Sequence, residues 1–209
     1  MKIIYGTTNL KKKQQVEDFF KATGITNIEL ISSKDIGFFE EIIEDGKTFE
    51  ENSLIKAKAI KKFCDKNKIE GIVVTDDTGL CVDCLNGEPG IYSARYVSKQ
   101  EHPNDHQEAS IKKLLENIEK TGDKERKAKF VCVLTAIMQN GDIKQVRGET
   151  LGTIAKTPGP MGKLTYGPIF IPEGFNKCMN ELRDDELGTT HREKAFLELL
   201  KILQNTNNA

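Results

Sequence analysis

The sequence predicts a mixed α/β protein. Short apolar runs typical of strands alternate along the chain with amphipathic segments typical of helices, and Gly, Pro and Asn separate them. The chain has 209 residues, of which 37% are hydrophobic and 30% charged, so it can bury the core of one domain or of one domain with two lobes. This composition excludes a disordered chain.

The first part of the chain predicts four strands and two helices. Val16, Phe19 and Phe20 recur at helical spacing before Gly24, and Thr48 and Glu51 have the spacing of a capping box. The expected elements are a strand at 2–5, a helix at 9–23, a strand at 28–33, an irregular acid-rich connection at 38–47, a helix from Thr48 to about Cys64, a strand at 71–75, a turn at Thr78–Gly79 and a strand at 80–85.

The second part continues the alternation of helix and strand. Asn140 and Gly141 open a hairpin turn, and Pro and Gly recur through residues 157–174, which predicts a long loop. The expected elements are a turn at 86–90, a helix at 105–120, a strand at 129–138, one or two strands over 143–155 and a final amphipathic helix from about His191.

Charge and hydropathy limit the possible partners. The net charge is -1, so no overall field draws the chain to nucleic acid or to a membrane. No apolar run approaches the roughly 18 residues of a membrane span, and the apolar stretch near the N-terminus is too short for a signal peptide. Five scattered cysteines are typical of a reducing compartment. We therefore expect a cytoplasmic protein.

The segment "GTTNLKK" at residues 6–12 leads from a predicted strand into a predicted helix. Backbone N–H groups at a helix N-terminus, with Thr7, Thr8 and Asn9 beside them, favour an anion, and Lys12 lies in the first turn of the helix. The spacing differs from that of a P-loop. The alternative is a capped helix start with solvated lysines.

Two further segments carry candidate polar groups. Asn52 and Lys56 are four residues apart and share a helix face, where Glu44 could join them; the alternative is a solvated face. His191 and Arg192 begin the final helix. An arginine there opposes the helix dipole, which indicates a bound anion as its partner.

Asp76 and Asp77 follow the apolar run of the predicted strand at 71–75. In open α/β sheets, ligands gather at the carboxyl ends of strands. Two adjacent carboxylates there can hold Mg²⁺ or orient a water molecule, and the cation removes their repulsion. The alternative is a turn in which either acid caps backbone amides. The pair after a fully apolar strand favours the metal site.

Together these segments resemble the inosine triphosphate pyrophosphatase family, over residues 3 to about 200. The motifs are "TTNLKK" (7–12), "EDGKTFEENSLIKAKA" (44–59), "DDTGLCVDCLNGEPGIYSARY" (76–96), "PIF" (168–170) and "HR" (191–192). The resemblance implies a single domain over 1–209, with two α/β lobes around a long mixed β-sheet that has helices on its faces. It places the active-site cleft between the lobes and implies a homodimer.

The resemblance also implies an activity and the residues that carry it. The implied reaction is Mg²⁺-dependent hydrolysis of nonstandard purine nucleoside triphosphates (ITP, dITP, XTP) to monophosphate and pyrophosphate, with Mn²⁺ as a possible substitute. The implied catalytic residues are Asp77, as general base, with Lys12 and Lys56; the metal ligands are Glu44, Asp77 and its neighbour Asp76; the substrate-binding residues are Thr7, Thr8, Asn9, Lys12, Asn52, Lys56, Thr78, Tyr166, His191 and Arg192.

The base-reading positions depart from the family pattern. Where the family has a "GFGYDPIF"-like segment, this chain has "GKLTYGPIF", so Leu164 replaces a stacking aromatic and Gly167 replaces an Asp, while Tyr166 is retained. Glu186 stands where the family has a purine-reading Lys, and Arg183 is a candidate substitute. The alternatives are therefore the same chemistry with altered or relaxed base specificity, or a non-catalytic nucleotide-binding protein.

Overall fold

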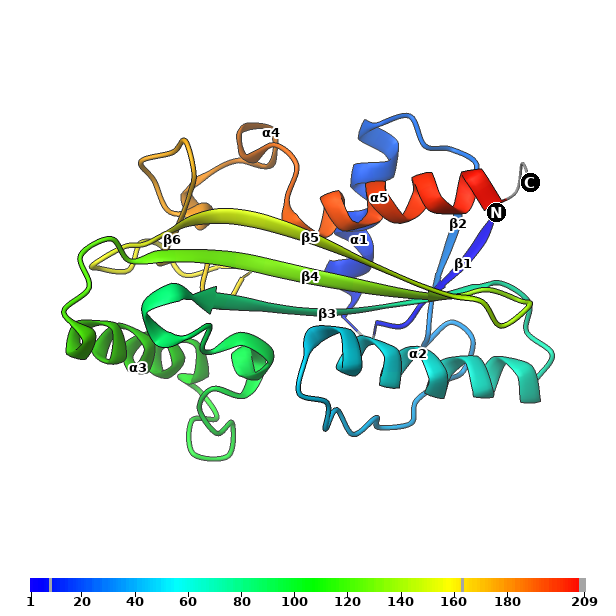
Figure 1. The fold of residues 1–209 in the computed structure, drawn as a ribbon, viewed down its shortest axis with the longest axis horizontal. Coiled ribbons are helices and arrows are strands. Elements are labelled where there is room, and N and C mark those ends of the chain that lie inside the picture. The colour runs from blue at the N-terminus through cyan, green and yellow to red at the C-terminus, as the bar shows by residue number, and fades with distance from the viewer. Residues whose placement is uncertain (8, 163, 207–209) are drawn as a thin grey trace. The chain divides into compact units, whose positions relative to one another are not determined.

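A computed structural model describes residues 1–7, 9–162 and 164–206, and it has the mixed α/β fold that the sequence predicts (Figure 1). Six strands form one sheet in the order β2-β1-β3-β4-β5-β6. In order, the elements are β1 (Lys2–Tyr5), α1 (Leu10–Ala22), β2 (Glu29–Ser32), α2 (Phe49–Lys66), β3 (Ile72–Val82), α3 (His106–Thr121), β4 (Lys127–Ile137), β5 (Ile143–Ile154), β6 (Phe170–Pro172), α4 (Asp184–Leu187) and α5 (His191–Thr206).

The sheet is mixed, as expected. β1 pairs in parallel with both β2 and β3, whereas β5 and β6 pair antiparallel. Tyr5, the last residue of β1, lies opposite Ser32 on one side and Val74 on the other. The chain therefore leaves β1 beside Val74 of β3, which brings Gly6 and Thr7 close to the acidic pair.

The prediction of a turn at Thr78–Gly79 is wrong, because β3 runs unbroken from Ile72 to Val82. Gly79 serves a close approach instead: a Cβ there would lie 2.2 Å from the carbonyl oxygen of Gly90. Ser93 stabilises the contact between β3 and Gly90, because its Oγ accepts from Leu80 N at 2.9 Å and donates to Gly90 O at 2.6 Å. Asp76 and Asp77 consequently lie in the middle of a strand and not at its carboxyl end.

The helices begin where their capping residues predict. The Asn9 side chain accepts from Lys11 N at the start of α1, and Thr48 accepts from Glu51 N at the start of α2. Residues 38–48 contain no helix or strand, as expected for the acid-rich connection. None of the helices in the described chain is long and apolar enough to cross a membrane.

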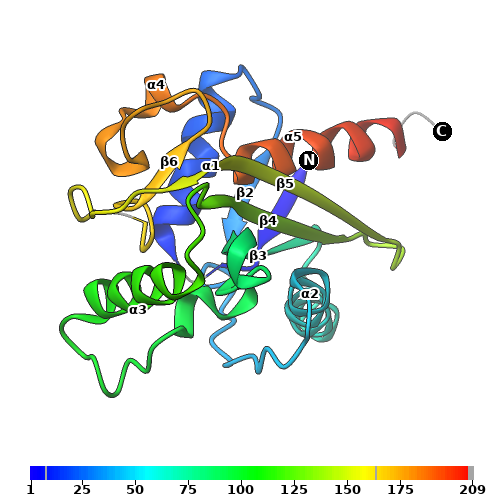
Figure 2. The same ribbon diagram turned by 60° about the vertical axis from the view of Figure 1, so that its left-hand side comes forward.

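The described residues group into two compact units. Unit 1 contains residues 1–77, 132–148 and the chain from 192 onward, and unit 2 contains residues 78–131 and 149–191. Within unit 1, α1 and α5 cover one face of the strands and α2 covers the other (Figures 1 and 2). The expected cleft between two lobes stays a prediction.

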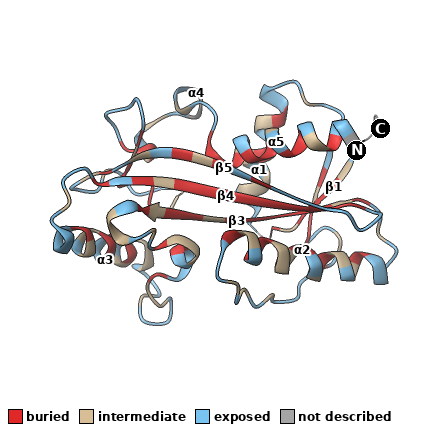
Figure 3. Ribbon diagram, in the orientation of Figure 1, coloured by how far each residue is buried: buried red, intermediate tan, exposed pale blue. Residues whose placement is uncertain are grey.

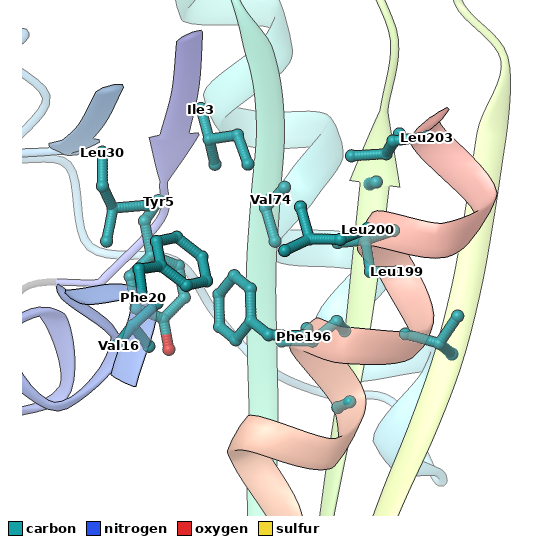
Figure 4. Close-up of a cluster of buried hydrophobic side chains, with 14 of the residues drawn as sticks. Ile3, Tyr5, Val16, Phe20, Leu30, Val74, Phe196, Leu199, Leu200 and Leu203 are labelled. Atoms are coloured by element: carbon teal, nitrogen blue, oxygen red, sulfur yellow. The ribbon is translucent and has the colours of Figure 1, made fainter. Parts of the chain in front are cut away.

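Unit 1 has a core on each face of its strands. Ile3, Tyr5 and Val74 point toward α1 and α5, where they meet Phe20 and Phe196 (Figure 4). The alternating residues point to the α2 side, where Ile4 and Val73 join Ile60 and Cys64. This alternation has period two, and it decides which helix each neighbouring side chain of β3 faces.

Unit 2 has a separate core. Leu80 and Val82 of β3, Leu114 of α3 and Phe130 of β4 contribute to it, together with Tyr166, which precedes β6. The expected long loop at 157–174 is wrong over Phe170–Pro172, because these residues form β6. β1, β3 and β4 are buried along most of their length, β5 alternates between exposed and buried residues, and the long helices bury one side only (Figure 3). In each unit, the candidate site residues are therefore supported by a packed hydrophobic core.

Phe196 lies at the centre of the α1/α5 core, with its ring 5.5 Å from Tyr5 and 5.7 Å from Phe20. We predict that Phe196→Ala lowers the free energy of unfolding by about 3–5 kcal/mol, because a large buried ring leaves a cavity. Urea titration followed by circular dichroism measures this. Phe39→Ala, at a position that is 75% exposed, is the control and should cost no more than about 0.5 kcal/mol. Equal losses in the two variants would contradict the prediction.

Candidate functional site

The adjacent acids of β3 face opposite sides of the strand. Asp76 continues the face of Val74 toward α1 and α5, and Asp77 continues the face of Val73 toward α2. Both side chains are buried. Buried charges require partners, so each acid gathers its own set of groups within unit 1.

Asp76 is the centre of the first set. Its Oδ1 accepts from Tyr5 Oη at 3.0 Å, and its Oδ2 accepts from Lys12 Nζ at 2.8 Å and lies 3.5 Å from Arg192 Nη2. Burial alone would raise the pKa of Asp76, but Lys12 and Arg192 hold it well below its ordinary value. Asp76 is therefore a carboxylate at neutral pH and joins β1, α1 and α5.

Lys12 reaches Asp76 because of the path that the chain takes after β1. Gly6 N donates to Val74 O at 2.7 Å. A Cβ at Gly6 would lie 2.4 Å from Ile60 Cδ1, so a larger residue would push this segment away. Thr7 Oγ1 then accepts from Asn9 N at 3.1 Å, and Asn9 caps α1. Lys12 follows in the first turn, on the side of β3.

Lys56 is the centre of the second set. Its Nζ lies 2.6 Å from Glu44 Oε2 and 3.6 Å from Asp77 Oδ1. Burial raises the pKa of Asp77; Lys56 opposes that rise and the Glu44 carboxylate adds to it, so the pKa ends above its ordinary value. Burial lowers the pKa of Lys56, but the carboxylates outweigh it and the pKa is raised. Two carboxylates thus share one cation.

The start of α2 is tied to β3 by reciprocal hydrogen bonds. Ser53 Oγ donates to Thr75 O at 3.1 Å, and Thr75 Oγ1 donates to Ser53 O at 2.6 Å. Asn52 is fully buried, and its Oδ1 accepts from Gly46 N at 2.9 Å. This bond holds the segment that carries Glu44 against α2. Asn52, predicted to contact substrate, therefore also helps to place a carboxylate.

Three predicted substrate residues belong to unit 2. Thr78 is half-buried in β3. Tyr166 is buried in the unit 2 core and its Oη donates to Ser93 O at 3.2 Å. The His191 ring is buried and stacks on Phe130, with centroids 5.1 Å apart and an interplanar angle of 14°. Their contact with substrate stays a prediction.

The departures from the family pattern have local structural counterparts in unit 2. A Cβ at Gly167 would lie 2.0 Å from Asn180 Oδ1, so glycine leaves the space that the Asn180 amide fills. Asn180 Nδ2 also donates to Pro160 O at 3.2 Å. Glu186 accepts from Arg183 N at 2.9 Å, which engages its carboxylate in capping α4. Arg183 and Glu186 therefore lie beside each other.

The structure brings most of the predicted phosphate and metal residues together in unit 1. These are Lys12, Asp76 and Arg192 in one set and Glu44, Asn52, Lys56 and Asp77 in the other, with Thr7 and Asn9 at the start of α1. Thr8 lies outside the described residues.

Sequence reasoning missed Tyr5 and Gln15. A hydroxyl at the end of an otherwise apolar strand, and an amide one turn after Lys12, were the available signals.

The comparisons with known proteins cover nearly the whole chain. A family model described as the Ham1 family matches residues 3–202. A curated relative from Clostridium perfringens, named dITP/XTP pyrophosphatase, is 38% identical over 202 residues, which is 96% of this chain and 95% of the relative. A relative of the same name from Bacillus subtilis is 36% identical and covers 96% of each chain.

Solved structures show the same fold. The Staphylococcus aureus Ham1 protein superposes with a TM-score of 0.79 at 33% identity and covers 99% of this chain and 100% of its own. A HAM1 protein from Coxiella burnetii superposes with a TM-score of 0.82 at 27% identity and covers 98% and 99%.

We predict that Tyr5→Phe destabilises the protein by about 1–3 kcal/mol, because the Asp76 carboxylate loses a buried donor. Burial and Asp76 raise the pKa of Tyr5 well above its ordinary value, so the phenol keeps its proton and donates. Urea titration measures the loss. Tyr92→Phe, at a position that is 52% exposed, is the matched control and should be neutral. A neutral Tyr5→Phe would show that Lys12 and Arg192 suffice for Asp76.

Proposed function

Because this chain belongs to the Ham1 family over residues 3–202, we propose that it hydrolyses ITP, dITP and XTP to monophosphate and pyrophosphate with Mg²⁺, and so removes nonstandard purine nucleotides. Membership of this family, with curated relatives named dITP/XTP pyrophosphatase, makes the chain a hydrolase of triphosphate anhydrides. The observation that carries the proposal is the pair of ion sets on the two faces of β3. Lys12 and Arg192 surround Asp76, and Lys56 joins Glu44 to Asp77.

The three cations support a triphosphate as the substrate. Phosphoryl transfer depends mainly on positioning and on neutralising charge. In this structure Lys12, Lys56 and Arg192 are held by carboxylates, so they are in place before substrate arrives. A triphosphate can share these cations with the carboxylates. The capped start of α1 adds backbone N–H groups, which favour phosphate oxygens.

The carboxylates around Lys56 fit a magnesium ion. Mg²⁺ in phosphate-binding sites is held by one or two carboxylates together with substrate oxygens and water. Glu44 and Asp77 already approach a single cation, and Glu44 contributes to the raised pKa of Asp77, as expected of two acids that lie close together. When bound, Mg²⁺ would stabilise the charge that develops on the phosphates and make a bound water more acidic.

Asp76 is a less supported metal ligand than Glu44 and Asp77. Its oxygens already accept from Tyr5 and Lys12 and lie near Arg192. Across the described chain, no three His, Cys, Asp or Glu side chains converge as a ready metal site. We propose that Asp76 acts mainly by holding the two cations, and that Asp77 accepts a proton from, or orients, the attacking water.

Altered base specificity is the second candidate, and the Gly167–Asn180 contact favours it. The segment that carries Leu164 and Gly167 presents no aromatic at 164 and no acid at 167, and the neutral Asn180 amide fills the space beside Gly167. Losing one stacked ring costs roughly 1–3 kcal/mol. The same pyrophosphate chemistry could therefore act on a wider range of bases.

The cytoplasmic location and the homodimer are proposals that rest on composition and on the resemblance. Sedimentation equilibrium measures the oligomeric state directly, and a monomer at working concentration would contradict the homodimer. A non-catalytic nucleotide-binding protein remains the alternative that an activity assay excludes.

We predict that the protein releases pyrophosphate from ITP in the presence of Mg²⁺ and that Asp77→Asn lowers kcat by about 10²–10⁴-fold, because the water loses its base. A pyrophosphate-coupled assay measures both. Asp65→Asn makes the same change at an exposed site and should keep full activity, and chelation of Mg²⁺ should stop the wild-type reaction. Release of orthophosphate, or an active Asp77→Asn, would contradict the proposed bond cleavage or the role of Asp77.

Profiling kcat/KM for inosine, xanthosine, guanosine, adenosine and pyrimidine triphosphates separates the two candidates. A strong preference for ITP and XTP supports the first, and values within about tenfold, or 1.4 kcal/mol, support relaxed specificity. If specificity is relaxed, Leu164→Phe should raise kcat/KM for purines by about 5- to 150-fold, which corresponds to the roughly 1–3 kcal/mol of one stacked ring. Restoring the acid requires Gly167→Asp together with Asn180→Ala, because the Asn180 side chain blocks position 167.

A further inference from the structure

Arg192 is an unusual residue for its place in the fold. It is buried at the start of α5, where the helix dipole disfavours a cation. A guanidinium stays charged in proteins and carries five N–H donors in a flat fork. Its burial therefore needs acceptors on more than one edge, and the identity of these acceptors determines which edge is left for a ligand.

Gln15 and Asp76 lie at the two ends of the fork, and the guanidinium also donates to the Tyr5 hydroxyl. Arg192 Nη1 donates to Gln15 Oε1 at 2.6 Å, and Arg192 Nη2 lies 3.5 Å from Asp76 Oδ2. The third donor, Nε, is buried and has no hydrogen-bond partner among the residues that the structure describes. The shortest contact of the guanidinium is thus with Gln15, and the Nε edge can still donate to an acceptor such as a phosphate oxygen.

Gln15 lies on the same side of α1 as Lys12, one turn later. Its Nε2 lies 3.5 Å from Glu193 Oε1, so both ends of the amide face the first turn of α5. Because the amide is neutral, it fixes Arg192 without cancelling its charge. Lys12 and Arg192 then face the single carboxylate of Asp76, and this set keeps a net positive charge.

We propose that Gln15 is a positioning residue for Arg192. It holds one edge of the guanidinium so that the remaining edge faces the triphosphate, and it does so without adding negative charge to the set around Asp76. This inference rests on the proposed function for its substrate, but the geometry behind it involves only α1, β3 and α5 of unit 1. Gln15 acts through Arg192 and is not itself a catalytic residue.

Three variants test the proposal. Gln15→Leu removes the acceptor at similar size, and Gln15→Glu keeps an acceptor but adds a charge. Gln14→Leu is the matched control, because the Gln14 amide pairs with Asp18 on the exposed side of the same helix. Thermal unfolding establishes that each variant is folded. If Gln15→Leu fails to fold, Gln15→Asn takes its place in the test, because it keeps the amide but shortens the side chain by one methylene.

With ITP and Mg²⁺, Gln15→Leu should lower kcat by about tenfold or more, the effect expected from losing a hydrogen bond to a charged group. Gln14→Leu should stay within about twofold. Gln15→Glu should recover most of kcat but raise KM, since the added charge opposes the phosphates. In an Arg192→Ala background, Gln15→Leu should have little further effect.

Calorimetric binding of inorganic tripolyphosphate without Mg²⁺ tests Gln15 independently of the reaction. Gln15→Leu should bind this probe about tenfold more weakly than Gln14→Leu does. If the wild type binds tripolyphosphate but cleaves no nucleotide, the proposed function fails and the inference about Gln15 is still tested. Equal behaviour of Gln15→Leu and Gln14→Leu, or an undiminished effect of Gln15→Leu without Arg192, would overturn the proposal.

Discussion

A carboxylate buried in the middle of a strand has to be neutralised where it lies, and this requirement at Asp76 organises unit 1. Its partners are a phenol from β1, an ammonium from α1 and a guanidinium from α5. Removing one partner of a buried charge is usually costly, because the others remain dehydrated and underpaired. The packing of α1 and α5 on the same face of the strands therefore depends on the charge of the Asp76 side chain. Asp76 in turn holds Lys12 and Arg192 in place in the absence of substrate.

Because side chains alternate along β3, Asp76 and Asp77 have different roles. Asp76 faces α1 and α5 and holds the cations that we assign to the phosphates, and Asp77 faces α2 and shares Lys56 with Glu44. One strand thus supplies two adjacent acids with different surroundings. Their pKa values move in opposite directions, downward for Asp76 and upward for Asp77, because cations dominate around the first and burial around the second. An identical residue type therefore serves as a fixed anion in one position and as a candidate base in the next.

Sequence reasoning located the acids, the capped helices and most of the ion partners, because periodicity, capping residues and ordered motifs are local signals. It misplaced the end of β3, because a glycine after Thr78 is typical of a turn. In the structure Gly79 instead allows the backbone of Gly90 to approach β3, where Ser93 hydrogen-bonds both segments. It also missed Gln15, whose partner is 177 positions away along the chain. Relations of this kind follow from packing: the helical spacing places Gln15 on the same side of α1 as Lys12, but it does not identify a partner in α5.

The set around Asp76 draws its members from the first, middle and last segments of the chain. Lys12 and Asp76 are 64 positions apart, and Asp76 and Arg192 are 116 apart. During synthesis, Asp76 and Lys12 can meet long before α5 has left the ribosome, and until then the carboxylate lacks its guanidinium. Contacts of such long range form late and slow the folding of a chain. Of the three cations that we assign to the triphosphate, Arg192 would accordingly take its place only when α5 docks.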